Sequence, residues 1–221
     1  MRENTIRADY NAHTNGAFFL PAEAIREDAT GAKAFSLATL ALERGELNLV
    51  GEIDTPLSQH LIMLMRYTAE NAMPLKIFLN SPGGEVTAGL AILDAIESYP
   101  YDVDIYCTGL AASMGAVILA GGRKGHRFIN PHGKVMIHEP LIAGGFGGSA
   151  SSIERTAQSI LETKATLNAL LAKYTGKSLE EINEATSFDN FFTPEEAIAF
   201  GLCDRIATGF ENGSARVNGR F

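Results

Sequence analysis

Short apolar runs alternate along the chain with longer stretches in which apolar residues recur every three or four positions. The short runs have the length and composition of buried strands, and the longer stretches have the spacing of one face of a helix. The expected strands are 46–51, 75–79 and 103–107, and the expected helices are 56–70, 86–96 and 116–120. Repeated strand–helix units predict an α/β fold in which helices cover a mainly parallel sheet.

The second half of the chain contains a glycine-rich segment, residues 142–150, followed by a long helix expected at 151–174. In the simplest interpretation the apolar residues of this helix pack it against its own domain. Further on, Thr193 and Glu196 have the spacing of a capping box, and Pro194 occupies the first helical position between them. Another helix is therefore predicted to begin there.

Composition indicates a compact domain. With 221 residues, 46% of them hydrophobic, the chain is long enough to bury a full core, and one domain is expected. A formal net charge of −8 argues against a nucleic-acid-binding surface. Cys107 and Cys203 lie far apart and are expected to be buried thiols, with no disulfide or metal site. Neither a membrane span nor a signal peptide is predicted, and the expected location is cytoplasmic.

Residues 109–116, Gly-Leu-Ala-Ala-Ser-Met-Gly-Ala, place Ser113 among small side chains between an expected strand and an expected helix. A serine nucleophile needs such a frame, because a substrate backbone has to reach it and neighbouring N–H groups have to face a developing oxyanion. The local sequence alone favours another interpretation, in which Ser113 only caps a close-packed helix. The motif is not the elbow of α/β-hydrolases, which has glycine at the position of Ala111.

Two distant residues strengthen the chemical interpretation. His138 ends a short apolar strand, residues 134–138, and Asp189 lies beside Phe188 just before the predicted capping box. A carboxylate buried among phenylalanines needs a hydrogen-bonded or charged partner, and an imidazole serves that purpose. A Ser/His/Asp triad is defined by geometry and roles, so its order along the chain is free. The remaining histidines lie in polar or turn-like contexts and suggest no chemistry: His13, His60, His126 and His132.

Residues 80–84, Asn-Ser-Pro-Gly-Gly, form a predicted turn between a strand and a helix. The paired glycines permit positive φ and a close approach of the backbone, which also suits a nucleotide or coenzyme A site. A P-loop is not present, because the Gly-Lys-Ser at 176–178 has Leu171 where the first glycine belongs. The 176–178 segment is interpreted as a helix end followed by the next N-cap.

Taken together, these segments closely resemble the proteolytic subunit of the Clp protease, in order and nearly in spacing. The matching segments are 80–84 (Asn-Ser-Pro-Gly-Gly), 87–89 (Thr-Ala-Gly), 111–116 (Ala-Ala-Ser-Met-Gly-Ala), 136–141 (Met-Ile-His-Glu-Pro-Leu), 192–197 (Phe-Thr-Pro-Glu-Glu-Ala) and 201–204 (Gly-Leu-Cys-Asp). The resemblance runs continuously from about residue 47 to residue 206. It implies an α/β, crotonase-like fold of repeated ββα units with a projecting handle helix at about 144–174, and no cofactor.

By this resemblance, Ser113 is the nucleophile, His138 the general base and Asp189 its orienting acid, while Gly84 and Met114 supply the oxyanion-hole N–H groups. The implied activity is that of a serine endopeptidase that cleaves peptides and unfolded proteins inside a self-compartmentalised ring. The resemblance also implies a homo-oligomer, a heptameric ring that stacks on a second ring through the handle. It implies a separate AAA+ unfoldase as partner, and no metal, nucleic acid or membrane.

Some features depart from the family pattern. Phe188 stands where the family usually has an arginine that senses ring pairing, and the glycine-rich segment is about two residues longer. The expected organisation is a divergent N-terminal segment (1–30), a peptidase domain (31–207) and a frayed tail (208–221). The N-terminal segment is interpreted as a gating loop, a propeptide or a disordered tail.

Two other functions remain open on this sequence. One is a crotonase-type acyl-CoA enzyme, which uses the oxyanion hole of the fold without a Ser/His/Asp set. The other is a non-catalytic ring subunit that has lost its triad. The complete set of Ser113, His138 and Asp189 counts against both.

Overall fold

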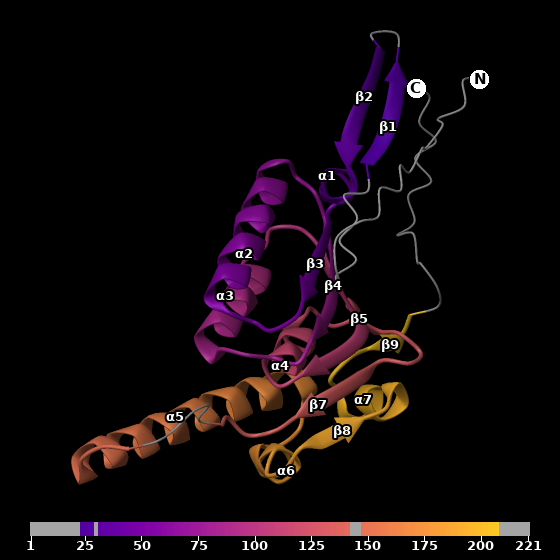
Figure 1. The fold of residues 1–221 in the computed structure, drawn as a ribbon. Coiled ribbons are helices and arrows are strands. Elements are labelled where there is room, and N and C mark those ends of the chain that lie inside the picture. Colours follow the sequence, from indigo (N-terminus) through magenta and orange to yellow (C-terminus); the bar gives the residue numbers. More distant parts are fainter. Residues whose placement is uncertain (1–22, 29–30, 142–146, 208–221) are drawn as a thin grey trace, which may run out of the picture.

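The computed structural model describes residues 23–28, 31–141 and 147–207, and within them it contains nine strands and seven helices (Figure 1). The strands are β1 (Glu23–Asp28), β2 (Gly31–Ser36), β3 (Glu46–Val50), β4 (Leu75–Ser81), β5 (Val103–Ala112), β6 (Arg127–Ile129), β7 (Lys134–Ile137), β8 (Asn190–Phe192) and β9 (Arg205–Ile206). The helices are α1 (Leu37–Leu42), α2 (Thr55–Glu70), α3 (Val86–Glu97), α4 (Met114–Gly121), α5 (Ala150–Thr175), α6 (Leu179–Ala185) and α7 (Pro194–Phe200).

The central sheet confirms the predicted α/β fold. Five strands pair in parallel in the order β3-β4-β5-β6-β9. Strand β7 is parallel to the C-terminal part of β5, and β8 is antiparallel to β7. Helices connect successive parallel strands, as α2 does between β3 and β4 and α3 between β4 and β5, because parallel neighbours require a crossover.

Strand β5 is longer than the sequence predicts, and the extension positions the serine. The expected strand ends at Cys107, whereas the observed one continues to Ala112. The first part pairs with β6 through Ile105–Cys107, and the second part pairs with β7 through Leu110–Ala112. The small residues of the second part hide its strand character from a pattern of apolar runs. As a result, Ser113 emerges directly from a paired strand.

The hydrophobic core lies between the sheet and the helices that cover it. Helix α4 is the most enclosed of the helices, because every residue from Met114 to Ala120 is buried. Its alanines and glycine let the helix approach the sheet closely, and Ile118 is fully buried there. Both cysteines are buried as predicted, and burial raises the pKa of Cys107 to about 11 and that of Cys203 to about 12. Neither thiol is therefore a reactive thiolate near neutral pH.

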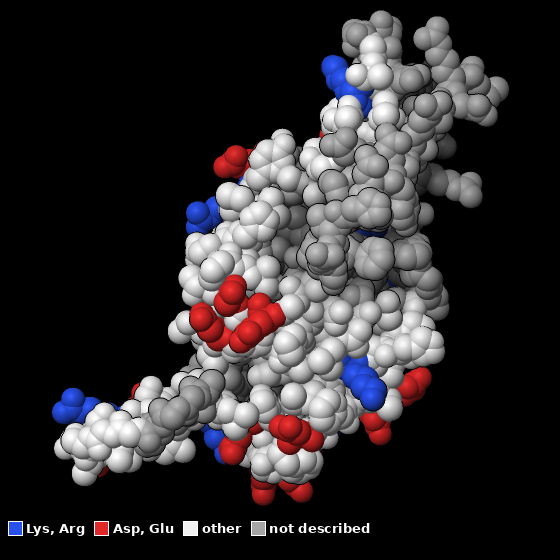
Figure 2. All heavy atoms as spheres, viewed as in Figure 1, with Lys and Arg blue, Asp and Glu red and all other residues white. Residues whose placement is uncertain are grey.

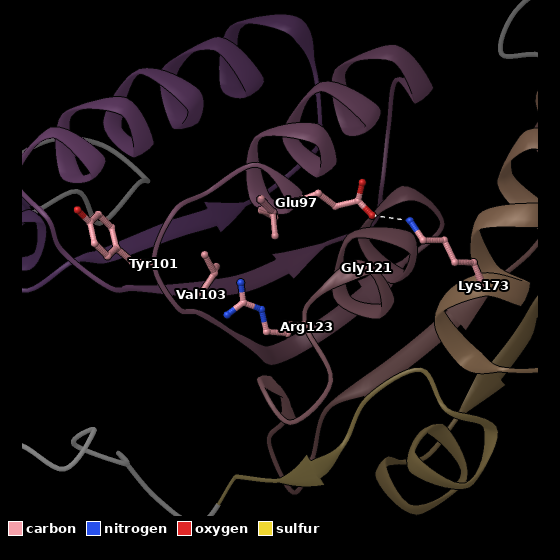
Figure 3. A pocket seen from close by; sticks show the side chains of 7 residues that line it. Glu97, Tyr101, Val103, Gly121, Arg123 and Lys173 are labelled. Atoms are coloured by element: carbon pink, nitrogen blue, oxygen red, sulfur yellow. Dashed lines mark hydrogen bonds and ion pairs between the residues drawn. The ribbon is translucent and has the colours of Figure 1, made fainter.

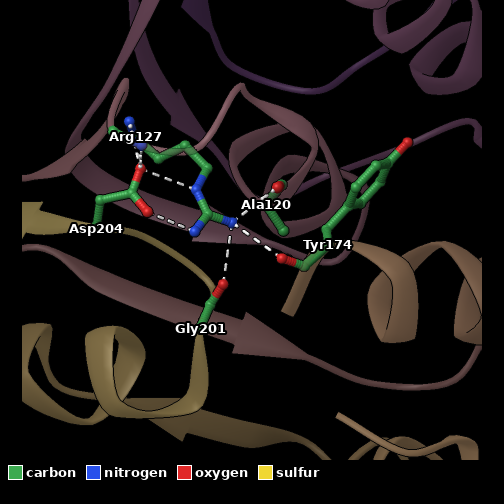
Figure 4. Close-up of polar contacts among 6 residues, drawn as sticks. Ala120, Arg127, Tyr174, Gly201 and Asp204 are labelled. Carbon is green, nitrogen blue, oxygen red and sulfur yellow. Dashed lines mark hydrogen bonds and ion pairs between the residues drawn. The ribbon is translucent and has the colours of Figure 1, made fainter. Parts of the chain in front are cut away.

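A buried arginine joins the ends of three helices (Figure 4). The Nη1 group of Arg127 donates to the carbonyl oxygens of Ala120 in α4, Tyr174 in α5 and Gly201 at the end of α7, at 3.0, 3.3 and 3.0 Å. Asp204 pairs with the same guanidinium through two hydrogen bonds of 3.0 and 2.5 Å. Helix C-termini leave carbonyl groups without intrahelical partners, and this cation satisfies them.

Helix α5 extends away from the body of the molecule (Figure 1). It begins at Ala150, and its buried residues, Leu167, Asn168, Leu171 and Tyr174, all lie in its C-terminal part. In the projecting part, Ile153 is 42% exposed and Leu161 is 59% exposed. The helix therefore packs on its own domain only through its last turns, and the rest projects as the resemblance implies.

The N-terminal region contains an element that the sequence analysis missed. Strands β1 and β2 form an antiparallel hairpin with Asp28 opposite Gly31, and Figure 1 shows it standing off the body. Residues 1–22 of the expected N-terminal segment and the expected tail 208–221 lie outside the described residues. Among the residues that are described, no helix is long and apolar enough to cross a membrane.

Candidate active site

Ser113 occupies a sharp turn between β5 and α4. Its backbone has φ 52° and ψ −120°, a conformation that non-glycine residues adopt at a cost of about 1–3 kcal/mol. Its N–H donates to the carbonyl of Met136 in β7 at 2.9 Å, which holds the turn in place. The residue stands at the N-cap position of α4, but its side chain makes no capping hydrogen bond. The simple interpretation of Ser113 as a capping residue is therefore wrong.

His138 follows the last residue of β7 and lies next to this serine. Pairing of β7 with β5 places Met136 opposite Ala112, so the residues that follow each strand emerge at the same edge. The Nε2 atom of His138 is 2.9 Å from Oγ of Ser113. Its Nδ1 atom is 3.1 Å from Oδ1 of Asp189, and the imidazole is only 15% exposed. The three side chains thus form one hydrogen-bonded row.

The surroundings of Asp189 differ from the expectation. The sequence suggests a carboxylate buried among phenylalanines, but its side chain is 64% exposed. The neighbouring Phe188 and Phe191 are 60% and 56% exposed. All three lie in or beside the turn between α6 and β8, at the surface of this chain. The prediction that Asp189 is buried is wrong, although its contact with His138 is present.

The glycine turn after β4 lies against the serine. A Cβ atom on Gly83 would come within 2.7 Å of Cβ of Ser113, so only glycine allows this approach. Gly84 has φ 150°, and a Cβ atom there would be 2.2 Å from the carbonyl oxygen of Ile53. Within the described residues, the N–H groups of Gly84 and Met114 donate no hydrogen bond. Two backbone donors without an acceptor therefore belong to the turns on either side of this contact.

The other titratable residues singled out in the sequence lie elsewhere. Asp204 pairs with Arg127, and Nδ1 of His126 is 2.7 Å from Oδ1 of Asp104. His60 and His132 are exposed, and His13 lies outside the described residues. Among the described residues no group of three or more His, Cys, Asp or Glu side chains forms a metal site.

A cavity of about 430 Å³ lies near the C-terminal end of α5 (Figure 3), and its lining does not include Ser113. Its lining includes Glu97 and Lys173, which form an ion pair of 2.9 Å, and Arg123, which pairs with Asp102. Each of these three charged side chains therefore already has an ion-pair partner. On the face drawn in Figure 2, acidic side chains gather in several places and basic side chains are scattered singly, in accord with the net charge of −8.

Sequence reasoning missed one ion pair beside the histidine. Nζ of Lys164 in α5 lies 2.5 Å from Oε2 of Glu139, the residue after His138. No local pattern predicts this contact, because the two residues are 25 positions apart and belong to different elements.

A family model described as Clp protease matches residues 29–209 of the chain. The match covers well over half of the 221 residues and includes all the site residues described above. The mixed α/β structure with its parallel sheet is consistent with the crotonase-like fold of these proteases, so the expected fold class is confirmed.

Proposed function

The chain belongs to the Clp protease family, and we propose that it is a serine endopeptidase in which Ser113 is the nucleophile, His138 the general base and Asp189 the acid that orients the imidazole. Family membership supports a peptidase. The observation that carries the specific proposal is the row of contacts in which His138 reaches Ser113 at 2.9 Å and Asp189 at 3.1 Å. These distances are within hydrogen-bond reach, as nucleophile activation requires.

In the proposed reaction, Oγ of Ser113 attacks the carbonyl carbon of the scissile peptide while Nε2 of His138 takes the hydroxyl proton. The imidazolium then gives that proton to the leaving amine, and an acyl ester remains on the serine. A water molecule, deprotonated by the same imidazole, hydrolyses the ester and restores the enzyme. Asp189 accepts a hydrogen bond from Nδ1 and so keeps the N–H proton of the neutral imidazole on that atom. This leaves Nε2 free to act as the base.

The N–H groups of Gly84 and Met114 are the proposed donors to the oxyanion. Their freedom from other acceptors within the described residues supports this role. Met114 is the first residue of α4, so its N–H also lies at the positive end of the helix dipole. Donors fixed in place before the reaction stabilise the developing charge without reorganisation.

Ser113→Ala tests the proposal. Cleavage of a fluorogenic peptide should fall by roughly 10⁶-fold, and a serine-directed phosphonate should no longer label the protein. Ser187→Ala, at an exposed serine two residues before Asp189, is the matched control and should retain full activity. Hydrolysis by Ser113→Ala at the wild-type rate would refute the assignment of the nucleophile. A wild-type protein that neither cleaves the peptide nor reacts with the phosphonate would instead fit an acyl-CoA enzyme or a non-catalytic subunit.

The proposed working form is a ring, a heptamer that stacks on a second ring, built from a peptidase domain at 31–207 with segments 1–30 and 208–221 outside it. The projecting part of α5, with its exposed Ile153 and Leu161, supports contact between copies. Phe188, 60% exposed, stands where the family usually has the arginine that senses ring pairing, so pairing of two rings would lack that switch. Sedimentation should give a ring-sized species, and a fully active monomer at every concentration would contradict the proposal.

A separate AAA+ unfoldase is the proposed partner. Unfolding a stable protein costs roughly 5–15 kcal/mol, and the sequence contains no P-loop through which ATP could supply it. The purified chain should cleave short peptides and loose chains but spare a folded fluorescent protein, with or without ATP. Rapid ATP-stimulated loss of fluorescence from this chain alone would overturn the proposal.

A further inference from the structure

Two bonds hold Glu139, the residue that follows His138. Its N–H donates to the carbonyl oxygen of Thr186 at 2.8 Å. Its carboxylate accepts a hydrogen bond from Lys164 on α5, with 2.5 Å between Nζ and Oε2. The backbone next to the imidazole is therefore fastened to α5 on one side and to the end of α6 on the other.

A second contact from the same face of α5 reaches the segment that leads to Asp189. Nδ2 of Asn168 donates to Oγ1 of Thr186 at 3.3 Å, and Asp189 follows three residues later. Lys164 and Asn168 are four residues apart and so lie one above the other on the helix. Asn168 and Thr186 are 2% and 0% exposed and belong to the packed interior. The ion pair is the accessible half of this double contact.

The position of this ion pair beside His138 should matter more for activity than its contribution to the stability of the fold. Lys164 and Glu139 are 32% and 42% exposed, and exposed pairs contribute only about 0–1 kcal/mol to folding. Removing the pair should therefore leave the fold intact. A displacement of about 1 Å in a catalytic group, by contrast, can lower a rate by roughly 100-fold.

We propose that Lys164 is a positioning residue of the active site, which acts through Glu139 to hold His138 between Ser113 and Asp189. This inference rests on the proposed function. The imidazole of His138 is held at its two nitrogens by Ser113 and Asp189, and the ion pair of Glu139 with Lys164 holds the backbone next to it. Loss of this ion pair should widen the range of imidazole positions and lower the fraction that can accept the serine proton.

The experiment compares kcat and KM for a short fluorogenic peptide in Lys164→Met, Lys164→Arg, Glu139→Gln and the double variant Lys164→Met/Glu139→Gln. The matched control is Lys177→Met, which removes a pair with Glu181 of similar exposure, 33% and 50%, at 3.0 Å. We expect Lys164→Met and Glu139→Gln each to lower kcat about 10- to 100-fold with KM changed less than about twofold. Lys164→Arg should restore most of the activity, and Lys177→Met should leave kcat unchanged.

The double variant supplies the decisive comparison. If Lys164 acts through Glu139, the double variant loses no more than either single variant, because the two residues form one interaction. Three outcomes would each overturn the inference. The first is a wild-type kcat in Lys164→Met, and the second is a loss in the double variant equal to the product of the two single losses. The third is a loss of kcat that accompanies a change in sedimentation or melting temperature. Ser113→Ala is measured first: full activity there refutes the proposed function, whereas an inactive Ser113→Ala with fully active Lys164 variants refutes only this inference.

Discussion

Asp189 and Asp204 both pair with a basic side chain, but the two pairs lie in different surroundings. Asp204 is 19% exposed and accepts hydrogen bonds from the guanidinium of Arg127 and from the N–H groups of Gly125 and Arg127. Asp189 is 64% exposed, and its contact is the 3.1 Å bond to Nδ1 of His138. One carboxylate is locked by four donors, and the other holds a single nitrogen.

The difference shows how burial and bond number separate two uses of the same residue type. Burial would raise the pKa of Asp204, but the hydrogen bonds and charge of Arg127 outweigh it, and the pKa is lowered. The carboxylate thus stays ionised and stabilises a cation that joins three helix ends. Asp189 joins no elements in this way. Its contact orients one imidazole, so its loss should affect catalysis and leave the fold nearly unchanged.

Between the two carboxylates, the largest expected effect comes from Asp189→Asn. An amide in place of the carboxylate favours the wrong tautomer of His138 and should lower kcat by about 10⁴-fold, as the same change does in a well-studied serine protease. The melting temperature should stay close to that of the wild type. Asp204→Asn is the control and should lower the melting temperature while leaving kcat within a few-fold at a temperature where it is folded. The opposite pattern would mean that Asp204 is the catalytic acid.

Arg127→Met should have the next largest effect, on stability. It removes the cation from beside the Asp204 carboxylate, which keeps only two backbone N–H donors, and from three helix-end carbonyl groups. Breaking a buried pair costs about 3–5 kcal/mol. Urea unfolding measures this loss. Replacing both partners, in Arg127→Met with Asp204→Leu, removes the unpaired charge and should recover part of it. A loss below about 1 kcal/mol in Arg127→Met would show that the pair does not hold the three helix ends together.

Gly83→Ala tests how far the active site depends on the close approach of the Gly83 backbone to Ser113. The added Cβ atom would come within 2.7 Å of Cβ of Ser113, at a residue with φ 96°. Displacement of the serine should lower kcat about 100-fold. Gly51→Ala is the matched control, because Gly51 has φ 93° but open space around it. Equal losses in the two variants would assign the effect to backbone strain and contradict a specific contact with Ser113.

The same contrast explains what the sequence could and could not predict. Helix α7 is predicted at its first residue, because Thr193 and Glu196 form the capping box that their spacing indicates. Local patterns of this kind, together with apolar periodicity, give the order of strands and helices from β3 to α4, but they do not give the hairpin of β1 and β2. The length of β5 and the exposure of Asp189 depend on which segments pair across the fold, and no local pattern contains that information. The contact between Ser113 and His138 is suggested by the Ser/His/Asp set and implied by the resemblance, but the local sequence around the serine alone favours a capping residue.

The smallest expected effect is a difference in how stability depends on pH. A carboxylate with a lowered pKa in the folded state contributes stability above its unfolded value of about 3.9, and the contribution is lost as the pH falls through the folded value. The pKa of Asp204 is lowered in this way, because the effects of Arg127 outweigh burial. The free energy of unfolding of the wild type, measured in urea, should therefore fall more steeply below about pH 4 than that of Asp204→Asn, by a total of about 1.4 kcal/mol for each unit by which the pKa is lowered. The two curves should converge in acid, where Asp204 is protonated and resembles the amide. A constant difference in the free energy of unfolding at every pH would show that the carboxylate stabilises the junction of the three helix ends through packing and not through its charge.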